Sequence, residues 1–266
     1  MTSDPHFDSR ILLVVATLGK RLSYLTETLQ SIRAQSVPAD VVMVAPPGNP
    51  ALHELAGSYG ARLVADPGSL AKAINLGVQE GLARHEFVNW LNDDDLLEPG
   101  SLETTSHLLD THPEAVVAFG SCRYIDEEGR ELWISKAGSF ASRILKWGPD
   151  LIPQPGMLVR ARDWLACGGL DESYQLAFDL DLLLRLKTRG RLIATPAIVS
   201  AFRWHADSLT VDGRSLNLAE SERAKRQALG PVARRMSWIW ERPMRLAIKL
   251  GASSVNRRAK RLSAEH

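Results

Sequence analysis

Three consecutive aspartates are the residues in this chain best suited to chemistry. Asn92 precedes Asp93, Asp94 and Asp95, and Pro99 follows shortly after them. Adjacent carboxylates repel one another and destabilise a fold unless a cation or hydrogen-bond donors compensate for their charge. Hard oxygen ligands of this kind suit Mg²⁺ or Mn²⁺, which carboxylates often hold together with substrate phosphates. A helix N-cap would need only one aspartate, so the pattern favours a metal site over a cap.

A second pair of carboxylates lies further along the chain, at Asp179 and Asp181. Residues two apart on a helix diverge, so the two side chains cannot act as twins on one face. Asp181 stands four residues before Arg185, which predicts an ion pair within the helix. The alternative for both aspartates is a solvated helix start, where the helix dipole favours negative charge.

A glycine-containing segment opens a predicted helix after residue 68. It contains Ser69, Lys72 and Asn75, and Asp66 stands just before it. Backbone N–H groups at a helix start can meet a phosphate or a sugar hydroxyl, and Lys72 can pair with a diphosphate. The segment is neither a phosphate-binding loop nor a dinucleotide fingerprint. A capped helix with a solvated lysine therefore remains the alternative.

Buried strands must position these residues. Continuous apolar runs predict four strands, at 11–16, 41–45, 62–65 and 87–91. Helical periodicity between them predicts helices from Leu25 to about Gln35, around Leu52 and Leu55, and over 69–84. This alternation indicates an α/β fold with a parallel, doubly wound sheet. The aspartates follow the fourth strand directly, at the edge where open α/β sheets bind ligands.

The second half of the chain departs from this alternation. Runs at 115–119 and 131–134 flank a turn at 126–129 and predict a hairpin. Residues 137–156, rich in Gly, Pro and Ser, form a long connection. A helix over about 176–189, a strand at 192–194 and a polar loop around His205 follow.

Composition excludes several classes of protein. The 266 residues carry a net charge of +1, with 45% hydrophobic residues, so the chain is neither disordered nor collagen-like. No apolar run approaches the roughly 20 residues of a membrane-spanning helix, and the polar start is unlike a secretory signal. Cys122 and Cys167 lack metal-binding spacing and are read as buried thiols of a reducing compartment. We therefore expect a cytoplasmic protein.

The charge is unevenly distributed. Residues 1–213 hold 19 Lys or Arg against 27 Asp or Glu, whereas residues 214–266 hold 13 against 4. We expect a domain over 1–213 and a basic, amphipathic helical extension over 214–266. A basic helix with tryptophan can lie on an anionic membrane, so 230–262 is a candidate contact with the inner face of the cell membrane. Packing against the acidic body or a second subunit is the alternative, and nucleic acid is not expected.

Taken together, the motifs resemble those of the family 2 glycosyltransferases, which have the GT-A fold. The acidic cluster with Pro99 resembles the family's Asp-x-Asp-Asp pattern, with Asn92 in place of the first Asp. Further matching segments are the residues Thr17, Leu25, Leu29, Ser31 and Gln35 at the start, the turn at 168–172, the helix at 179–185 and the segment 202–208. Four motifs in the family's order over about 200 residues make the resemblance specific.

The resemblance implies an inverting transfer of a sugar from a nucleotide-diphosphate donor to a hydroxyl of a saccharide or lipid-linked acceptor, in cell-surface glycan synthesis. It implies that Asp179 is the catalytic base and that Mg²⁺ or Mn²⁺ is held by Asp94, Asp95 and His205. The donor would lie against a further set of residues: Thr17, Asp66, Ser69, Lys72, Asn75, Asn92, Asp93 and Arg203. Residues 1–100 would form the nucleotide-sugar half and 101–213 the acceptor half. The segment 137–156, with Trp147 and Gln154, would form the acceptor-side wall or lid.

Two departures from the family pattern affect specificity. Phe178 replaces the glutamate that usually precedes the base, and residues 45–49 lack the aspartate that usually follows the second strand. Two other classes of protein stay open at this point. One is a nucleotidyltransferase acting on sugar phosphates, for which residues 17–21 offer only a faint basic loop, and the other is a catalytically silent sugar-binding homologue.

Overall fold

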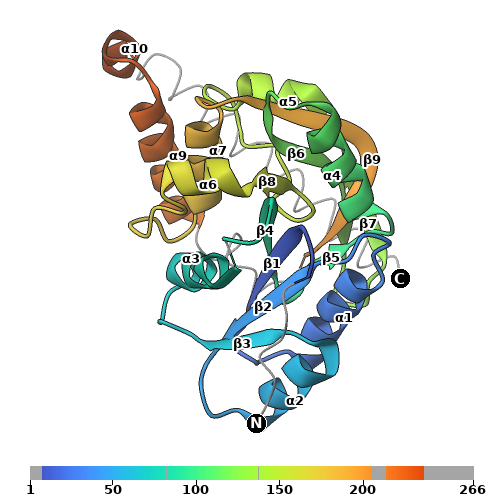
Figure 1. The fold of residues 1–266 in the computed structure, drawn as a ribbon. Coiled ribbons are helices and arrows are strands. Elements are labelled where there is room, and N and C mark those ends of the chain that lie inside the picture. Colours follow the sequence, from blue (N-terminus) through green and yellow to red (C-terminus); the bar gives the residue numbers. More distant parts are fainter. Residues whose placement is uncertain (1–7, 82, 137, 205–213, 237–266) are drawn as a thin grey trace.

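The computed structural model describes residues 8–81, 83–136, 138–204 and 214–236. Within these residues the strands form one mixed sheet with the order β3-β2-β1-β4-β8-β6-β9-β5, and β7 pairs with β6 (Figure 1). The strands are β1 (Ile11–Ala16), β2 (Asp40–Ala45), β3 (Arg62–Ala65), β4 (Phe87–Asn92), β5 (Leu96–Leu97), β6 (Ala115–Ile125), β7 (Glu131–Ser135), β8 (Leu158–Arg160) and β9 (Arg191–Arg203).

Helices cover both faces of the sheet. They are α1 (Leu22–Arg33), α2 (Pro50–Tyr59), α3 (Leu70–Gly81), α4 (Ser101–Thr111), α5 (Gly138–Ile144), α6 (Ala161–Cys167), α7 (Phe178–Leu186), α9 (Arg214–Ala228) and α10 (Pro231–Met236). In Figure 1, α3, α6, α7 and α9 lie to the left of the central strands, and α1, α2 and α4 lie to the right. The predicted α/β class is confirmed.

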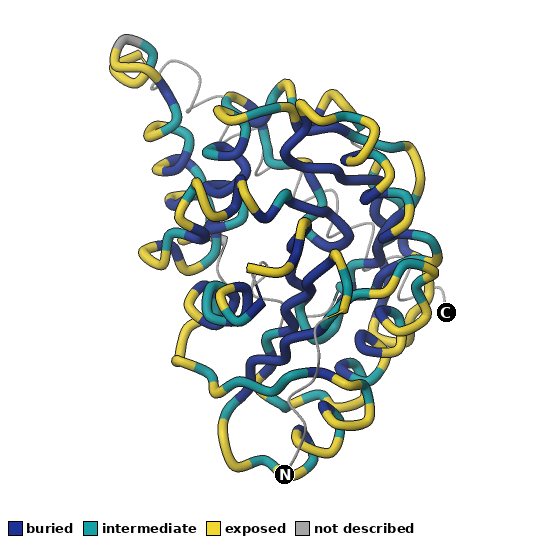
Figure 2. The backbone as a smooth tube through the Cα atoms, viewed as in Figure 1, coloured by how far each residue is buried: buried dark blue, intermediate teal, exposed yellow. Residues whose placement is uncertain are grey.

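The central strands are buried on both faces, as their apolar sequences predict. In β1, Leu12 and Val14 pack into the core shared with α3 and α7, whereas Leu13 and Val15 pack into the core shared with α1 and α4. This alternation follows from the two-residue period of a strand. In Figure 2 the tube is coloured as buried along most of these central strands.

Four parallel strands direct their carboxyl ends to one edge. β1 pairs in parallel with both β2 and β4, and β2 pairs in parallel with β3. Residues that follow these strands therefore gather at the same edge: Thr17 after β1, Asp66 after β3 and Asp93 after β4. This arrangement is the one that the apolar runs predicted.

The second half contains longer strands than its sequence predicts. β6 extends the predicted 115–119 strand to Ile125: its first part lies between β8 and β9, and its second part forms the predicted hairpin with β7. The predicted strand 192–194 extends to Arg203 in β9, although Pro196 interrupts its pattern. The β6–β9 register shifts accommodate this interruption, as bulges commonly do in long strands.

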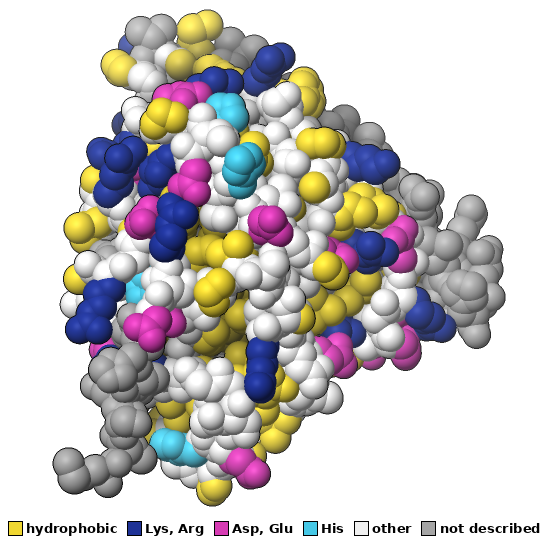
Figure 3. All heavy atoms as spheres, turned by 45° about the vertical axis from the view of Figure 1, so that its right-hand side comes forward, with side chains coloured by type: hydrophobic (Ala, Val, Ile, Leu, Met, Phe, Trp, Pro, Cys, Tyr) yellow, Lys and Arg dark blue, Asp and Glu magenta, His cyan; other side chains and the backbone are white. Residues whose placement is uncertain are grey.

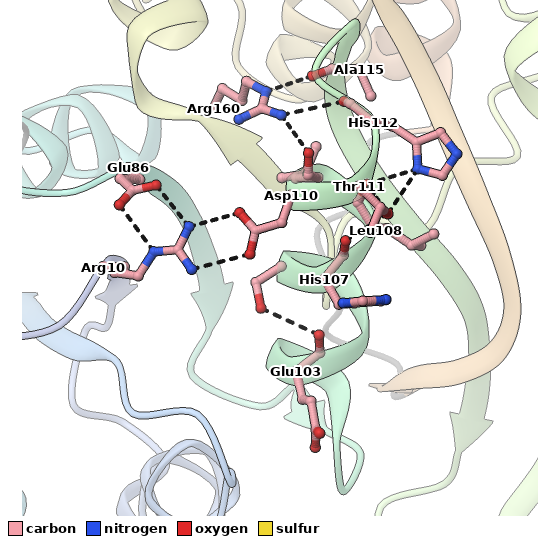
Figure 4. Close-up of polar contacts among 12 residues, drawn as sticks. Arg10, Glu86, Glu103, His107, Leu108, Asp110, Thr111, His112, Ala115 and Arg160 are labelled. Atoms are coloured by element: carbon pink, nitrogen blue, oxygen red, sulfur yellow. Dashed lines mark hydrogen bonds and ion pairs between the residues drawn. The ribbon is translucent and has the colours of Figure 1, made fainter.

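At the opposite edge, arginines join the sheet to α4 (Figure 4). Arg10 forms ion pairs with Glu86 and Asp110 at 2.8 and 2.7 Å. Arg160 donates to the carbonyl groups of Leu109 and Ala115, where α4 ends and its dipole is negative. These contacts are structural and lie away from the acidic cluster.

None of the described helices is both long enough and apolar enough to cross a bilayer. On the face shown in Figure 3, acidic and basic side chains of the described residues are interspersed. The candidate membrane-contact segment 230–262 lies outside the described residues beyond Met236.

Candidate active site

The acidic cluster lies at the carboxyl end of β4, next to the end of β1. The Thr17 hydroxyl donates to Asp93 Oδ2 at 2.5 Å, and burial raises the pKa of Asp93 above its usual range. Asp94 is partly exposed, and its Oδ2 lies 3.4 Å from Arg21 Nη1. The exposed fraction of the Asp94 side chain is 16%, so within the cluster this carboxylate has access to a ligand.

Asp95 has a different environment, because it is fully buried. Its two carboxylate oxygens accept from Asn92 Nδ2 at 2.9 Å and from the Arg203 backbone N–H at 3.3 Å. Burial, and then the charge of Asp94, raise the pKa of Asp95 well above its usual range. Asp95 therefore ties the end of β4 to the end of β9.

Helix α1 holds the segment that follows the cluster. Ser31 Oγ accepts from the Leu97 backbone N–H at 3.1 Å. Gln35 Nε2 donates to the Glu98 carbonyl at 3.0 Å, and Gln35 Oε1 accepts from the Leu102 N–H at 3.2 Å. These contacts give Ser31 and Gln35, two of the residues that carried the resemblance, a physical role: they fix the backbone on which the aspartates are placed.

Arg203 lies beneath the cluster and is fully buried. Its Nε donates to the Asp94 carbonyl at 3.2 Å, its Nη1 to the Glu127 carbonyl at 2.9 Å, and its Nη2 to Glu27 at 2.5 Å. The guanidinium also stacks over Tyr24 at 4.3 Å from the ring centre. Groups of the protein thus hydrogen-bond the guanidinium of Arg203, for which the resemblance implies a donor contact.

The segment before α3 lies at the same edge of the sheet. Asp66 follows β3 and accepts from the Gly68 N–H at 2.8 Å, which forms a tight turn before the helix. Ser69 and Lys72 lie at the start of α3 and are exposed. The structure therefore leaves both available for the predicted donor contact.

Asn75 reaches across to the acceptor half. Its Nδ2 donates to the Leu170 carbonyl, its Oδ1 accepts from the Leu170 N–H, both at 2.9 Å, and Nδ2 also lies 3.1 Å from Glu172 Oε1. Asn75, for which the resemblance implies a donor contact, holds with its amide the turn that leads to α7.

The proposed base lies on the first turn of α7. Burial raises the pKa of Asp179 to about 6, and the Leu180 N–H donates to its Oδ1 at 2.7 Å. The ion pair predicted for Asp181 is confirmed, because Arg185 Nε donates to Asp181 Oδ2 at 2.8 Å. Asp179 and Asp181 thus have separate environments on one helix.

A second carboxylate, Asp150, acts on the same site although no sequence motif predicts it. Burial, and then the negative charge of Asp179, raise the pKa of Asp150 to about 7. Asp150 belongs to the connection 137–156, where it accepts from the Ile152 N–H at 3.0 Å. The only signal in the sequence is an acidic residue after Gly148 and Pro149 in an otherwise poorly charged stretch.

The Tyr124 phenol is influenced by the charges of two carboxylates, Asp95 and Asp150. Burial raises the pKa of this phenol, and the charges of Asp95 and Asp150 both add to this effect. The charge of Asp179 acts in turn on Asp150.

Two other predicted acceptor-side residues differ in exposure. Gln154 Nε2 donates to the Trp90 carbonyl at 2.7 Å and lies 3.2 Å from Asn89 Oδ1, so it braces the connection against β4. Trp147 is 44% exposed and follows α5, the helix within this connection.

The carboxylates of the acidic cluster suit a hard divalent cation, but the described residues supply only part of a set of ligands. Across the described part of the chain, no three His, Cys, Asp or Glu side chains converge as a metal site. His205, the predicted nitrogen ligand, lies outside the described residues. Mg²⁺ and Mn²⁺ commonly bind through one or two carboxylates together with substrate phosphates, and the partly exposed Asp94 fits that mode.

Comparison with known proteins agrees with this geometry. The model of the family "Glycosyl transferase family 2" matches residues 13–167, more than half of the chain. No curated protein sequence matches the chain significantly.

Solved structures share the fold at low sequence identity. A mannosyltransferase from Pyrobaculum calidifontis, solved with GDP-Man and Mn²⁺, has a TM-score of 0.63 at 17% identity, over 98% of this chain and 81% of that chain. Residues 1–349 of S. aureus TarS give a TM-score of 0.62 at 16% identity, over 86% of this chain and 69% of that one. The match to a longer TarS chain spans 44% of its length. The chain therefore belongs to glycosyltransferase family 2 and has the GT-A fold.

Proposed function

We propose that this glycosyltransferase moves a sugar from a nucleotide-diphosphate donor to a hydroxyl of a saccharide or lipid-linked acceptor, with inversion at the anomeric carbon. In a single in-line displacement, the acceptor oxygen bonds to the anomeric carbon as the bond to the diphosphate breaks. The acceptor proton passes to a carboxylate, and the leaving diphosphate takes up the negative charge.

The observation that carries this proposal is the environment of Asp179. A carboxyl group with a pKa of about 6 can be ionised near neutral pH and still accept a proton effectively. It stands in the first turn of α7, and its charge raises the pKa of the neighbouring Asp150. We assign to it the role of catalytic base.

On the donor side, we propose that Asp94 holds Mg²⁺ or Mn²⁺, with His205 as a further ligand. A bound cation would stabilise the charge that develops on the leaving diphosphate. Asp95 and Asn92 keep the loop in place beneath Asp94, and Arg203 supports it through the Asp94 carbonyl. Thr17, Asp66, Ser69, Lys72 and Asp93 complete the proposed donor surface.

The first experiment measures donor binding. Thermal unfolding is followed with UDP, GDP, CDP and ADP, each with and without Mn²⁺. We expect a metal-dependent rise in Tm for at least one nucleotide, because a ligand that binds the folded state stabilises it. An Asp94→Asn variant should lose the metal-dependent part, whereas Asp110→Asn, the same change at the opposite edge, should retain it. No shift with any nucleotide would contradict the proposal.

The second experiment measures turnover. Release of nucleoside diphosphate from UDP-glucose, UDP-N-acetylglucosamine and GDP-mannose is followed with an oligosaccharide acceptor mixture. We expect Asp179→Asn to lower kcat by a factor on the order of 10² or more, the usual contribution of a general base. Asp110→Asn again serves as control. Unchanged turnover in Asp179→Asn would exclude Asp179 as the base, and release of inorganic diphosphate from a nucleoside triphosphate and a sugar phosphate would support a nucleotidyltransferase instead.

The same proposal includes a saccharide or lipid-linked acceptor and a role in cell-surface glycan synthesis. It also includes contact of 230–262 with the inner face of the membrane. A lipid-linked acceptor would place the reaction at a membrane surface, where the basic sequence of 230–262 suits anionic lipid. Co-sedimentation with phosphatidylglycerol vesicles tests this directly. Binding that disappears when residues 237–266 are removed would support it, and equal binding by both chains would oppose it.

A further inference from the structure

One buried carboxylate on α9 holds the backbone at the start of α7. Glu220 is 7% exposed. Its Oε1 accepts from the Gln175 N–H at 2.9 Å, and its Oε2 accepts from the Leu176 and Ala177 N–H groups at 2.8 and 3.0 Å. Three consecutive backbone N–H groups that converge on one anion form a nest, an arrangement that binds negative charge well.

Helix α7 lacks a cap from its own local sequence. Ala177 occupies the cap position, and no side chain there bonds the first turn. N–H groups at a helix start need partners from elsewhere when the local sequence offers none. Glu220, more than 40 residues later, accepts from the N–H group of Ala177 at this cap position.

The charge of Glu220 fits this role. Burial alone would raise its pKa, but the three backbone N–H groups outweigh burial and lower the pKa below its usual range. The carboxylate therefore stays ionised near neutral pH. Charge-assisted hydrogen bonds of this kind are shorter and stronger than neutral ones.

The same helix also reaches the segment that carries Asp150. Lys225 Nζ donates to the Gly148 carbonyl at 2.6 Å, two residues before Asp150, and its charge lowers the pKa of Asp150 against the larger opposite effect of burial. Separately, the Tyr174 hydroxyl donates to Gln227 at 2.7 Å. Helix α9 thus contacts both segments whose carboxylates act on each other.

We propose that Glu220 is a positioning residue that holds Asp179 in place through the backbone at the start of α7. The inference rests on the proposed function, in which Asp179 is the base. Asp179 follows the last of the three bonded N–H groups by two residues, so a shift of the 175–177 backbone displaces its carboxylate. A displacement of about 1 Å at a reacting group can lower a rate by about 10²-fold.

The test compares two variants of α9. Glu220→Gln preserves the size of the side chain but removes its charge and turns an NH₂ group towards N–H donors. Gln227→Ala removes the partner of the Tyr174 hydroxyl on the same helix and leaves residues 175–177 untouched. We expect Glu220→Gln to lower the kcat of nucleoside diphosphate release by about tenfold or more, with the KM for the nucleotide sugar changed less than about twofold. Gln227→Ala should resemble the parent.

A second readout needs no substrate. In ¹³C NMR of the aspartate carboxyl carbons, Asp179 is identified by its absence from Asp179→Asn, and its titration near pH 6 is followed. We expect Glu220→Gln to move this titration towards the ordinary aspartate range as the carboxyl group becomes hydrated, and Gln227→Ala to leave it unchanged. A parent-like titration together with a parent-like kcat in Glu220→Gln would overturn the inference.

The design separates this inference from the proposed function. If Asp179→Asn keeps full turnover, the proposed base is wrong, while the NMR titration still reports whether Glu220 positions Asp179. If Glu220→Gln lowers kcat by the same factor in the Asp179→Asn background, Glu220 acts elsewhere and the inference fails. Should Glu220→Gln not fold, Glu220→Asp is measured in its place. It keeps the charge and retracts the carboxylate by one methylene, and a parent-like kcat and titration would overturn the inference.

Discussion

At the scale of single residues, Asp150 and Asp179 make the proton balance of the site sensitive to pH near neutrality. Burial raises the pKa of both groups, and the charge of one opposes ionisation of the other. Two interacting carboxyls release their protons in steps that belong to the pair. The pair should therefore lose one proton near pH 6 and the other near pH 7.

The sign of the effect on activity follows from the role of the base. A base must be ionised to accept a proton, so kcat should be retained above the first step and fall as the pH drops through about 6. Below that point we expect about a tenfold decrease per pH unit. Asp150→Asn removes the second carboxyl, so ¹³C NMR should show one titration in place of two, with the acid limb of kcat retained. Two titrations in Asp150→Asn, or a flat profile between pH 5 and 7 in the parent, would contradict this account.

At the scale of elements, the turn before α7 depends on two consecutive glycines. Gly168 and Gly169 have φ values of +77° and +72°, a backbone region that L side chains rarely adopt. A Cβ atom at Gly169 would lie 2.6 Å from Asn75 Oδ1, whereas a Cβ at Gly168 would meet nothing within 4 Å. An L residue would have a strained φ at either position, but only at Gly169 would its Cβ atom also meet a neighbouring side chain.

Substituting each glycine by alanine separates these effects. We expect Gly168→Ala to lower the free energy of unfolding by about 1–2 kcal/mol through backbone strain alone. Gly169→Ala should lower the free energy of unfolding by about 1–3 kcal/mol more, because the added Cβ atom also displaces the Asn75 amide from its hydrogen bonds with Leu170. Urea denaturation of both variants measures the difference. Equal losses would show that the Asn75 contact relaxes without a free-energy penalty.

At the scale of the whole molecule, the two predicted halves share one sheet. β8 pairs with β4 of the first half and with β6 of the second, and Asn75 joins α3 to the turn before α7. Both cores contain residues from both halves, and the core between the sheet, α3 and α7 includes Ile74 and Leu182. Neither half can separate without breaking the ladder and exposing this core.

We therefore expect residues 8–236 to unfold in a single cooperative transition. Near-UV and far-UV circular dichroism should give coincident melting curves, and the calorimetric enthalpy should equal the van't Hoff enthalpy. A separate early transition confined to tryptophan fluorescence of the second half would contradict this expectation. The measurement is best made on the full chain without nucleotide, because ligand binding by itself changes the apparent stability.

The sequence by itself determined the first four strands, the helices between them and the edge where the aspartates lie. Continuous apolar runs and helical periodicity are local signals, and the parallel pairing of β1 with β4 follows from their alternation. The motifs likewise determined the family. They also predicted the Asp181–Arg185 ion pair, since residues four apart on a helix are always neighbours.

Only the tertiary structure decided which polar side chains are held by contacts within the fold. Asp95, Arg203 and Asn75 look as suitable for binding as Asp94 in the sequence, yet contacts from distant segments engage all three. Neither Asp150 nor Glu220 lies in a recognisable motif, because the interactions that single them out are with residues far away in the chain. Burial and partner identity depend on how segments pack together, and no local pattern of residues encodes them.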